Sequence, residues 1–239
     1  MKRSRVLEAL ETRLTAYDAS FSAAESLATL LELLEAPDSP TSVRDPAVAL
    51  DVHVADSLSG LQIPALRTAR LIADLGSGGG LPGLVLAAAL PDARVVMIES
   101  LNRKCAFIRD AASAMGLLNV EVECVRAEEW KDGAGACDVV TARALASLPV
   151  VYEYAAPLLR DDGVVVAWKG EVTEAEAADG AAAAILLGLA EEPPLAVRPF
   201  AGSERRTLRV ARKTAPTPPN FPRRPGIATK RPLSVKNLR

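Results

Sequence analysis

The sequence predicts an α/β protein with a Rossmann-like, mostly parallel sheet and helices on both of its faces. Three observations support this prediction. From residue 70 onward, short apolar runs alternate with helical patterns at the spacing of strand–helix–strand units. The first apolar run enters a glycine-rich turn, and the last two strand-like segments have no clear helical pattern between them. We therefore expect parallel strands for most of the sheet and an antiparallel hairpin at one edge.

Helices are expected before the first strand. The first spans residues 5–17 and the second residues 22–34. In the first, apolar residues recur at three- and four-residue spacing: Val6, Leu10, Leu14 and Tyr17. Asp45-Pro46 is a helix-start signal, because Asp caps a helix and Pro suits its first position; the helix it begins runs to about Leu58. Residues 1–69 are therefore predicted to form a helical cap within the same globular unit.

Residues 70–213 are predicted to form the core that holds the sheet. Strands are expected over residues 71–75, 94–98, 120–125, 137–141 and 164–168, and helices over residues 81–90, 102–115 and 148–159. The two later strands, near residues 195–200 and 207–211, would form the antiparallel hairpin.

The charge is distributed unevenly along the chain. The 239 residues carry a net charge of -2, but from Ser203 onward eleven Lys and Arg residues accompany a single acid, a net charge of +10. Residues 214–239 are rich in proline and are predicted to form an extended arm. Such an arm suits a polyanion, nucleic acid before anionic lipid, although a solubilising tail would have the same composition.

Composition excludes several classes of protein. A hydrophobic content of 49% with a small net charge excludes a chain that is disordered throughout. The apolar runs are too short for a bilayer span, and no secretion signal precedes them, so a cytoplasmic protein without membrane contact is expected. Only three cysteines occur, without CxxC spacing. They argue against a disulfide framework or a metal site and are expected to be small buried residues.

A glycine-rich turn, Asp74 to Gly80 (DLGSGGG), lies where the first strand meets a helix. Glycines there let a ligand lie against bare backbone at the carboxyl edge of the sheet, and Glu99, which ends the next strand, can accept hydrogen bonds from a ribose diol. The pattern indicates a nucleotide-like ligand, with a purely structural turn as the other interpretation. The spacing of Gly78, Gly80 and Gly83 also fits the dinucleotide fingerprint, so a small NAD-dependent oxidoreductase stays an alternative.

Three features favour S-adenosylmethionine over NAD as the ligand. Asp74 is an acid within an apolar strand, where a carboxylate needs a partner; a ligand ammonium group would supply one, whereas a pyrophosphate would be repelled. No Walker lysine follows the glycines, which excludes a P-loop. Only about 110 residues separate Glu99 from the arm, too few for the second nucleotide-binding half of a dehydrogenase.

Motifs along nearly the whole chain, from about residue 6 to residue 213, resemble those of the RsmG family, also called GidB. They are SVRDP (residues 42–46), HVADSL (53–58), IADLGSGGGLPGL (72–84), AE (127–128), ARA (142–144) and WKG (168–170). Members of this family are bacterial methyltransferases that act on N7 of a guanine in small-subunit ribosomal RNA. The segment PRRPGIATKRPL resembles an extension that some members carry. The family's Arg-His pair is Val52-His53 here, which leaves any role of the His53 helix open.

The resemblance implies a class I methyltransferase fold with a seven-stranded sheet, and S-adenosylmethionine as the methyl donor. It carries over Gly76, Leu81, Ala127, Glu128 and Arg143 as cofactor contacts. Together with the acids and the turn above, the predicted cofactor site comprises Asp74, Gly76, Ser77, Gly78, Leu81, Glu99, Ala127, Glu128 and Arg143. Arg143 and Arg206 are predicted to position the target base.

The implied partner is 16S rRNA or the small ribosomal subunit, bound by a monomer without a metal ion. The predicted RNA contacts are Arg126, Lys169, Arg205, Arg206, Arg223, Arg224, Lys230 and Arg231, each of which could also be an ordinary surface charge. Guanine N7 carries an in-plane lone pair and no proton, so direct in-line attack on a sulfonium methyl needs no general base. Alignment alone can supply much of the catalysis. An inactive methyltransferase-like RNA-binding protein stays the other alternative.

Overall fold

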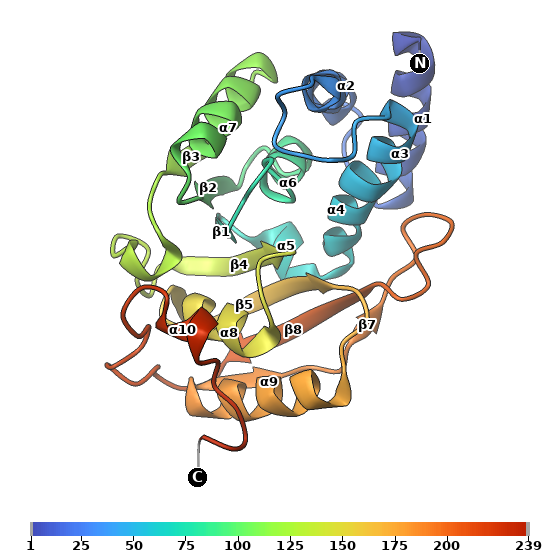
Figure 1. Ribbon diagram of the computed structural model, residues 1–239. Helices are drawn as coiled ribbons and strands as arrows, with labels where there is room; N and C mark the ends of the chain where they lie inside the picture. The colour runs from blue at the N-terminus through green and yellow to red at the C-terminus, as the bar shows by residue number, and fades with distance from the viewer. Residues whose placement is uncertain (1, 238–239) are drawn as a thin grey trace.

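A single mixed sheet forms the centre of the molecule (Figure 1). The computed structural model describes residues 2–237. The strands are β1 (Leu71–Leu75), β2 (Arg94–Ile98), β3 (Val120–Glu123), β4 (Cys137–Arg143), β5 (Leu159–Lys169), β6 (Leu189–Glu191), β7 (Leu195–Ala196) and β8 (Thr207–Lys213). Their order is β3-β2-β1-β4-β5-β8-β6, with β7 also paired to β8. The first five strands are parallel and β8 is antiparallel to β5, which confirms the predicted fold class.

The sheet has eight strands where seven were expected, because the edge strand next to β8 is split in two. β6 and β7 pair in succession along β8, opposite residues 211–213 and 207–208 respectively. Between them stands Pro193-Pro194. Proline has no N–H to donate to a ladder, so the prolines divide one edge strand into two short pieces.

The N-terminal helices are α1 (Arg3–Ala16), α2 (Ala23–Glu35), α3 (Pro46–Ala49), the π-helical η1 (Leu50–Ala55), α4 (Asp56–Leu58), the 3-10 turn η2 (Ser59–Gln62) and α5 (Pro64–Thr68). The Asp45 carboxylate accepts hydrogen bonds from the N–H groups of Ala47 and Val48, as the cap signal predicts. The helix it begins continues past Leu58 and contains the π segment, which was not expected from the sequence. π segments often mark functional sites.

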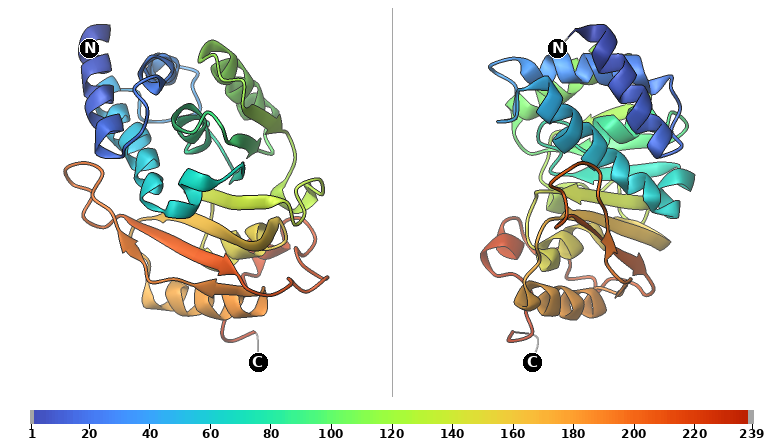
Figure 2. Two further views of the ribbon diagram at one scale, coloured as in Figure 1. Left: turned by 180° about the vertical axis from the view of Figure 1, so that it is seen from behind. Right: turned by 90° about the vertical axis from the view of Figure 1, so that its right-hand side faces the viewer.

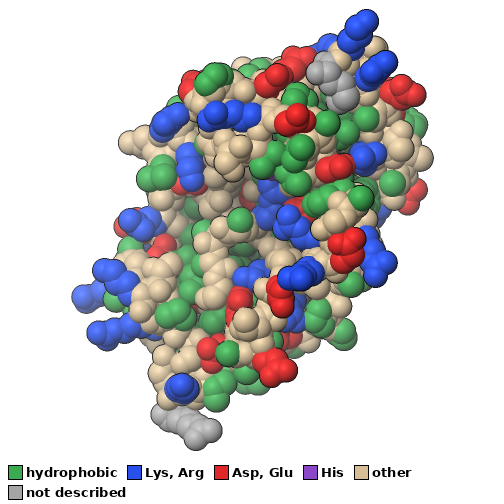
Figure 3. Space-filling view, turned by 45° about the vertical axis from the view of Figure 1, so that its right-hand side comes forward, with side chains coloured by type: hydrophobic (Ala, Val, Ile, Leu, Met, Phe, Trp, Pro, Cys, Tyr) green, Lys and Arg blue, Asp and Glu red, His purple; other side chains and the backbone are tan. Residues whose placement is uncertain are grey.

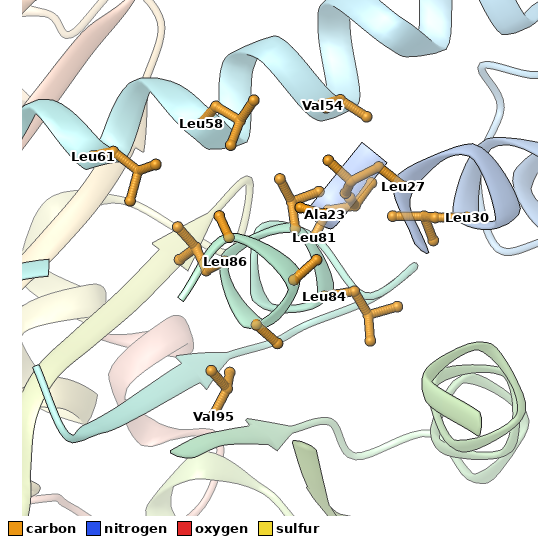
Figure 4. Packing of buried hydrophobic residues seen from close by; sticks show 14 of the residues in the cluster. Ala23, Leu27, Leu30, Val54, Leu58, Leu61, Leu81, Leu84, Leu86 and Val95 are labelled. Atoms are coloured by element: carbon orange, nitrogen blue, oxygen red, sulfur yellow. The ribbon is translucent and has the colours of Figure 1, made fainter. Parts of the chain in front are cut away.

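Helices cover both faces of the sheet (Figure 2). The N-terminal helices share one hydrophobic cluster with α6 (Gly83–Ala89) and α7 (Asn102–Ala114), whereas α8 (Leu148–Ala155) and α9 (Glu174–Leu186) pack on the opposite face. In Figure 4, Leu27 of α2 and Leu58 of α4 both approach α6, which presents Leu84 and Leu86. This packing holds α6, and the turn that precedes it, between the N-terminal helices and the sheet.

The C-terminal segment is not the extended arm that was expected. It folds back onto the body and contains α10 (Ile227–Lys230), which packs against α8 (Figure 1). Ala228 and Leu233 are buried in the cluster beneath the sheet. The proline content correctly argued against a long helix, but it said nothing of these tertiary contacts. Residues 238–239 of the predicted arm lie outside the described residues.

The expectation that the cysteines are unpaired was wrong. Cys105 on α7 and Cys124 after β3 form a disulfide, with their Cα atoms 5.9 Å apart. Only Cys137 is free, and it is buried. The pair is 19 residues apart in sequence, and it meets because α7 packs beside β3, which sequence spacing did not reveal.

Neither a membrane span nor a metal cluster occurs within residues 2–237. No helix there is long and apolar enough to cross a bilayer. In the same part of the chain, no group of three or more His, Cys, Asp and Glu side chains is arranged to hold a metal ion.

Candidate functional site

The glycine-rich turn closes directly after β1. Gly76 adopts a φ of +65°, a left-handed conformation that favours glycine, and its N–H donates to the carbonyl of Ile98 at the end of β2. A Cβ at Gly76 would lie 2.5 Å from the Leu145 side chain. The turn is completed by bonds from the N–H groups of Gly80 and Leu81 to the Ser77 carbonyl. The backbone of Gly76 lines both of the hollows described below.

Glu99 follows β2 and is held by backbone alone. One oxygen accepts hydrogen bonds from the N–H groups of Ser100 (2.8 Å) and Leu101 (2.9 Å). The other accepts from the N–H of Gly78 at 3.0 Å. The carboxylate is 6% exposed and lines a hollow beside the turn. Its position is thus fixed before any ligand arrives.

Asp74 does not face the ligand space in the way that the sequence suggested. It is fully buried, and its two oxygens accept hydrogen bonds from the Thr141 hydroxyl (2.8 Å) and the Gly83 N–H (3.2 Å). Burial raises the pKa of Asp74 to about 6, against the opposing effect of these donors. The carboxylate thus has partners within the protein and lines neither of the two hollows described below, so no ligand ammonium is needed to explain it.

Two hollows meet at the carboxyl edge of the sheet. The first has a volume of about 390 Å³ and is lined by four predicted cofactor residues: Gly76, Glu99, Ala127 and Glu128. The second, of about 240 Å³, is lined by five: Gly76, Ser77, Gly78, Leu81 and Arg143. Gly76, Lys104 and Ala144 line both, so the hollows adjoin. Of the nine predicted cofactor residues, only Asp74 lies behind this surface.

Arg143 and Arg206, the two predicted positioning residues, meet at one carboxylate. The Asp56 side chain, 1% exposed, accepts a hydrogen bond from Arg143 at 3.0 Å and lies 3.7 Å from the Arg206 guanidinium. The indole of Trp168 donates to the Asp56 carbonyl at 2.8 Å. Desolvation lowers the pKa of Arg143, and Asp56 opposes that shift. No role was predicted for Asp56. The sequence did offer a signal, because an acid between Val54 and Leu58 lies in a mostly apolar part of the helix, where a charge needs a partner.

His53 lines the second hollow from the π segment. Its Nε2 lies 3.0 Å from the Thr41 hydroxyl, and its Nδ1 is buried without a partner among the described residues. Burial, followed by the charge of Arg143, lowers the pKa of His53 to about 4. The imidazole is therefore uncharged at neutral pH and keeps one unused hydrogen-bonding atom beside the hollow.

The predicted RNA contacts fall into two groups. Four are in ion pairs: Lys169 with Glu176 (2.6 Å), Arg205 with Glu171 (2.8 Å), Arg206 with Asp56 (3.7 Å) and Arg223 with Glu153 (2.6 Å). The other four are exposed: Arg126, Arg224, Lys230 and Arg231. Figure 3 shows Lys and Arg side chains at the left margin and near the centre of one face. The Arg223 pair is largely buried, which leaves that guanidinium little freedom to bind RNA.

This strand order, with a glycine turn after β1, an acid after β2 and an antiparallel last strand, defines a class I S-adenosylmethionine-dependent methyltransferase fold. Solved structures agree. A SAM-dependent methyltransferase from Aquifex aeolicus is 12% identical, with a TM-score of 0.56 over 77% of this chain and 97% of that one. Precorrin-6y C5,15-methyltransferase from Geobacter metallireducens is 17% identical, with a TM-score of 0.50 over 66% of this chain and 88% of that one.

The sequence comparison is more specific. Residues 22–198 match the family model for rRNA small subunit methyltransferase G, GidB. The relative of that name from Rubrobacter xylanophilus is 45% identical over 199 residues, which cover 80% of this chain and 75% of the relative. The one from Deinococcus radiodurans is 39% identical over 220 residues, covering 89% and 86%. The chain belongs to the rRNA small subunit methyltransferase G family, and the resemblance seen in the motifs is confirmed.

Proposed function

We propose that this chain transfers a methyl group from S-adenosylmethionine to N7 of a guanine in 16S rRNA. The observation that carries the proposal is the placement of eight predicted cofactor residues around two adjoining hollows at the carboxyl edge of the sheet. Ligands of open α/β sheets bind at this edge. Family membership supplies the expected substrate.

The residues of the first hollow suit S-adenosylmethionine, which when bound supplies an electrophilic methyl group on a sulfonium. Gly76 lines both hollows with backbone alone, and a Cβ there would displace Leu145, which also lines the first hollow. The fixed Glu99 carboxylate suits the two hydroxyls of a ribose. Ala127 and Glu128, which line the same hollow, can offer backbone and a carboxylate to an adenine edge.

The second hollow is lined by the other predicted cofactor residues, and we propose that the target guanine enters it beside the cofactor. Arg143 lines the second hollow and can donate hydrogen bonds to guanine O6 or to a phosphate. Asp56 holds the Arg143 guanidinium in place. An uncharged His53 does not repel the ring, which gains positive charge as it is methylated. Guanine N7 needs no base, so these residues orient the nucleotide for direct in-line attack and take no proton.

RNA would approach over exposed cations: Arg126, which lines the first hollow, and Arg224, Lys230 and Arg231 of the C-terminal segment. We propose a monomer as the active unit. A 16S rRNA substrate supports a cytoplasmic location for the protein.

The test is mass-spectrometric mapping of 7-methylguanosine in 16S rRNA from cells with and without this protein. We expect one guanine to lose its methyl group without the protein and to regain it on complementation. Identical maps would contradict the proposal. Calorimetry on the purified chain adds a check on the cofactor: S-adenosylhomocysteine should bind and NAD should not.

A further inference from the structure

The C-terminal segment, residues 221–237, is fixed to the body by a buried ion pair. Arg223 donates to the Glu153 carboxylate of α8 through Nε (2.8 Å), through a terminal nitrogen (2.6 Å) and through its backbone N–H (3.0 Å). The Glu153 side chain is 1% exposed. A buried carboxylate without a counter-ion is strongly destabilising. This pair therefore ties the segment to α8.

The segment also covers apolar surface that the core leaves open. The connection from β3 to β4 contains only a three-residue turn, η3 (Ala127–Glu129), whereas the parallel strands β1, β2, β4 and β5 are each followed by a longer helix. Ala228 (1% exposed) and Leu233 (5% exposed) join the cluster on this face, which also contains Trp130. Such burial is favourable by about 25 cal/mol per Å² of apolar surface. Ion pair and apolar contacts together make the segment part of the fold.

The same segment reaches the first hollow. The N–H of Gly226 donates to a carboxylate oxygen of Glu128 at 2.9 Å. Three residues on, Thr229 is exposed and lines the first hollow, as does Tyr154 of α8. The segment thus contacts both a predicted adenine-binding residue and the hollow itself.

We propose that the C-terminal segment is a wall of the cofactor site and sets the affinity for the cofactor. This inference rests on the proposed function, because it takes the first hollow as the S-adenosylmethionine site. Gly226 holds Glu128 in place, and Thr229 lines the same hollow as Ala127 and Glu128. A preformed wall raises affinity because less order is lost on binding. The segment is then a structural part of the enzyme and not only a basic arm for RNA.

The first experiment is cofactor protection of an introduced thiol in the full chain. Cys105 and Cys124 are paired, and burial raises the pKa of the Cys137 thiol to about 12, so the native background is low. Thr229→Cys should react rapidly with a maleimide, and saturating S-adenosylhomocysteine should slow that reaction several-fold. Val235→Cys, an exposed position outside the hollow, is the matched control and should react at one rate with or without the ligand.

The second experiment loosens the attachment. Arg223→Gln combined with Glu153→Gln removes both charges of the buried pair, and we expect S-adenosylhomocysteine affinity to fall at least about tenfold. Arg212→Gln combined with Glu192→Gln removes an exposed pair at the sheet edge and should leave the affinity unchanged. Thermal melting reports whether each variant folds. If the first double variant does not fold, the thiol experiment decides alone.

The outcomes separate this inference from the proposed function. If the unaltered chain does not bind S-adenosylhomocysteine, the proposed function fails. Suppose instead that the unaltered chain binds S-adenosylhomocysteine, that the ligand does not protect Thr229→Cys, and that the Arg223→Gln, Glu153→Gln variant binds it with unchanged affinity. The proposed wall is then refuted and the proposed function stands.

Discussion

At the scale of single residues, one buried carboxylate joins the two arginines that are predicted to position the target base. Asp56 contacts both Arg143 and Arg206, and neither arginine is adjacent to it in sequence. Family motifs were enough to predict the arginines, and from the sequence alone Arg143→Ala would be expected to lose activity with the fold intact. The structure changes that expectation, because the substitution leaves the buried Asp56 carboxylate without the Arg143 partner.

We predict that Arg143→Ala lowers methyl transfer by about 100-fold and the free energy of unfolding by about 3 kcal/mol. The Arg143 side chain is 12% exposed and that of Asp56 is 1% exposed, so solvent screens this pair weakly. Denaturant melts and single-turnover methylation measure the two effects. Adding Asp56→Asn should restore part of the stability and none of the activity. Simple additivity of the two stability losses would show that the residues are not coupled.

A second residue-scale prediction concerns His53 and pH. Its pKa is lowered from 6.5 to about 4 in the folded chain, by burial and then by Arg143. Between these values the unfolded chain binds a proton that the folded chain does not, so stability falls as the pH falls. We expect the stability of the unaltered protein relative to His53→Gln to drop by up to about 3 kcal/mol between pH 7 and pH 4. The contribution of Asp74 to stability changes with pH in the opposite direction, because its pKa is raised in the folded chain. Asp74 is present in both proteins, so its contribution cancels in the difference. A difference independent of pH would refute the burial of a neutral imidazole.

At the scale of elements, the turn after β1 is the feature that most limits substitution. Gly76→Ala should cost about 1–2 kcal/mol through its left-handed backbone and should also weaken S-adenosylhomocysteine binding, because its Cβ meets Leu145 at 2.5 Å. Gly116 has a similar φ of +69°, but an added methyl group there would have nothing within 4 Å. Gly116→Ala should therefore cost similar stability and leave the affinity unchanged. Calorimetry and melting of both variants test this, and equal affinities would place Gly76 outside the site.

The elements that sequence could predict are those that local chemistry determines. Asp45 with Pro46 marked a helix start, and β1 and β2 were predicted at the residues where they occur, because a buried parallel strand is an apolar run. α9 was missed because its alanine-rich sequence has little apolar periodicity. Its cap was a usable signal, since Thr173 accepts a hydrogen bond from the Glu176 N–H.

Features that depend on distant parts of the chain escaped prediction. The Cys105–Cys124 disulfide, the Arg223–Glu153 pair and the position of Asp56 beside Arg143 all join residues from separate elements. Family motifs and the acid after β2 pointed to eight residues that line the two hollows. The motifs did not identify the residues that hold these side chains in place, because many different residues of suitable charge could do so.

At the scale of the whole molecule, the uneven charge should still govern RNA binding. Arg224, Lys230 and Arg231 are exposed on the segment that we propose as the wall of the cofactor site. Replacing all three by Gln should weaken rRNA binding and reduce the slope of log affinity against log salt by about 2, since each lost phosphate contact contributes about 0.7–0.9. Filter binding across a salt series measures the slope. The matched control replaces the exposed Lys2, Arg5 and Arg70 by Gln. An equal loss of rRNA affinity in the control would show that net charge alone explains the effect.

The most direct test of the account uses the purified chain, isotope-labelled S-adenosylmethionine and small ribosomal subunits or their rRNA. After nuclease digestion, mass spectrometry should find the labelled methyl group on N7 of a single guanine in 16S rRNA, approaching one group per molecule. A label that stays on the donor, or that appears on another atom or another RNA, would contradict it.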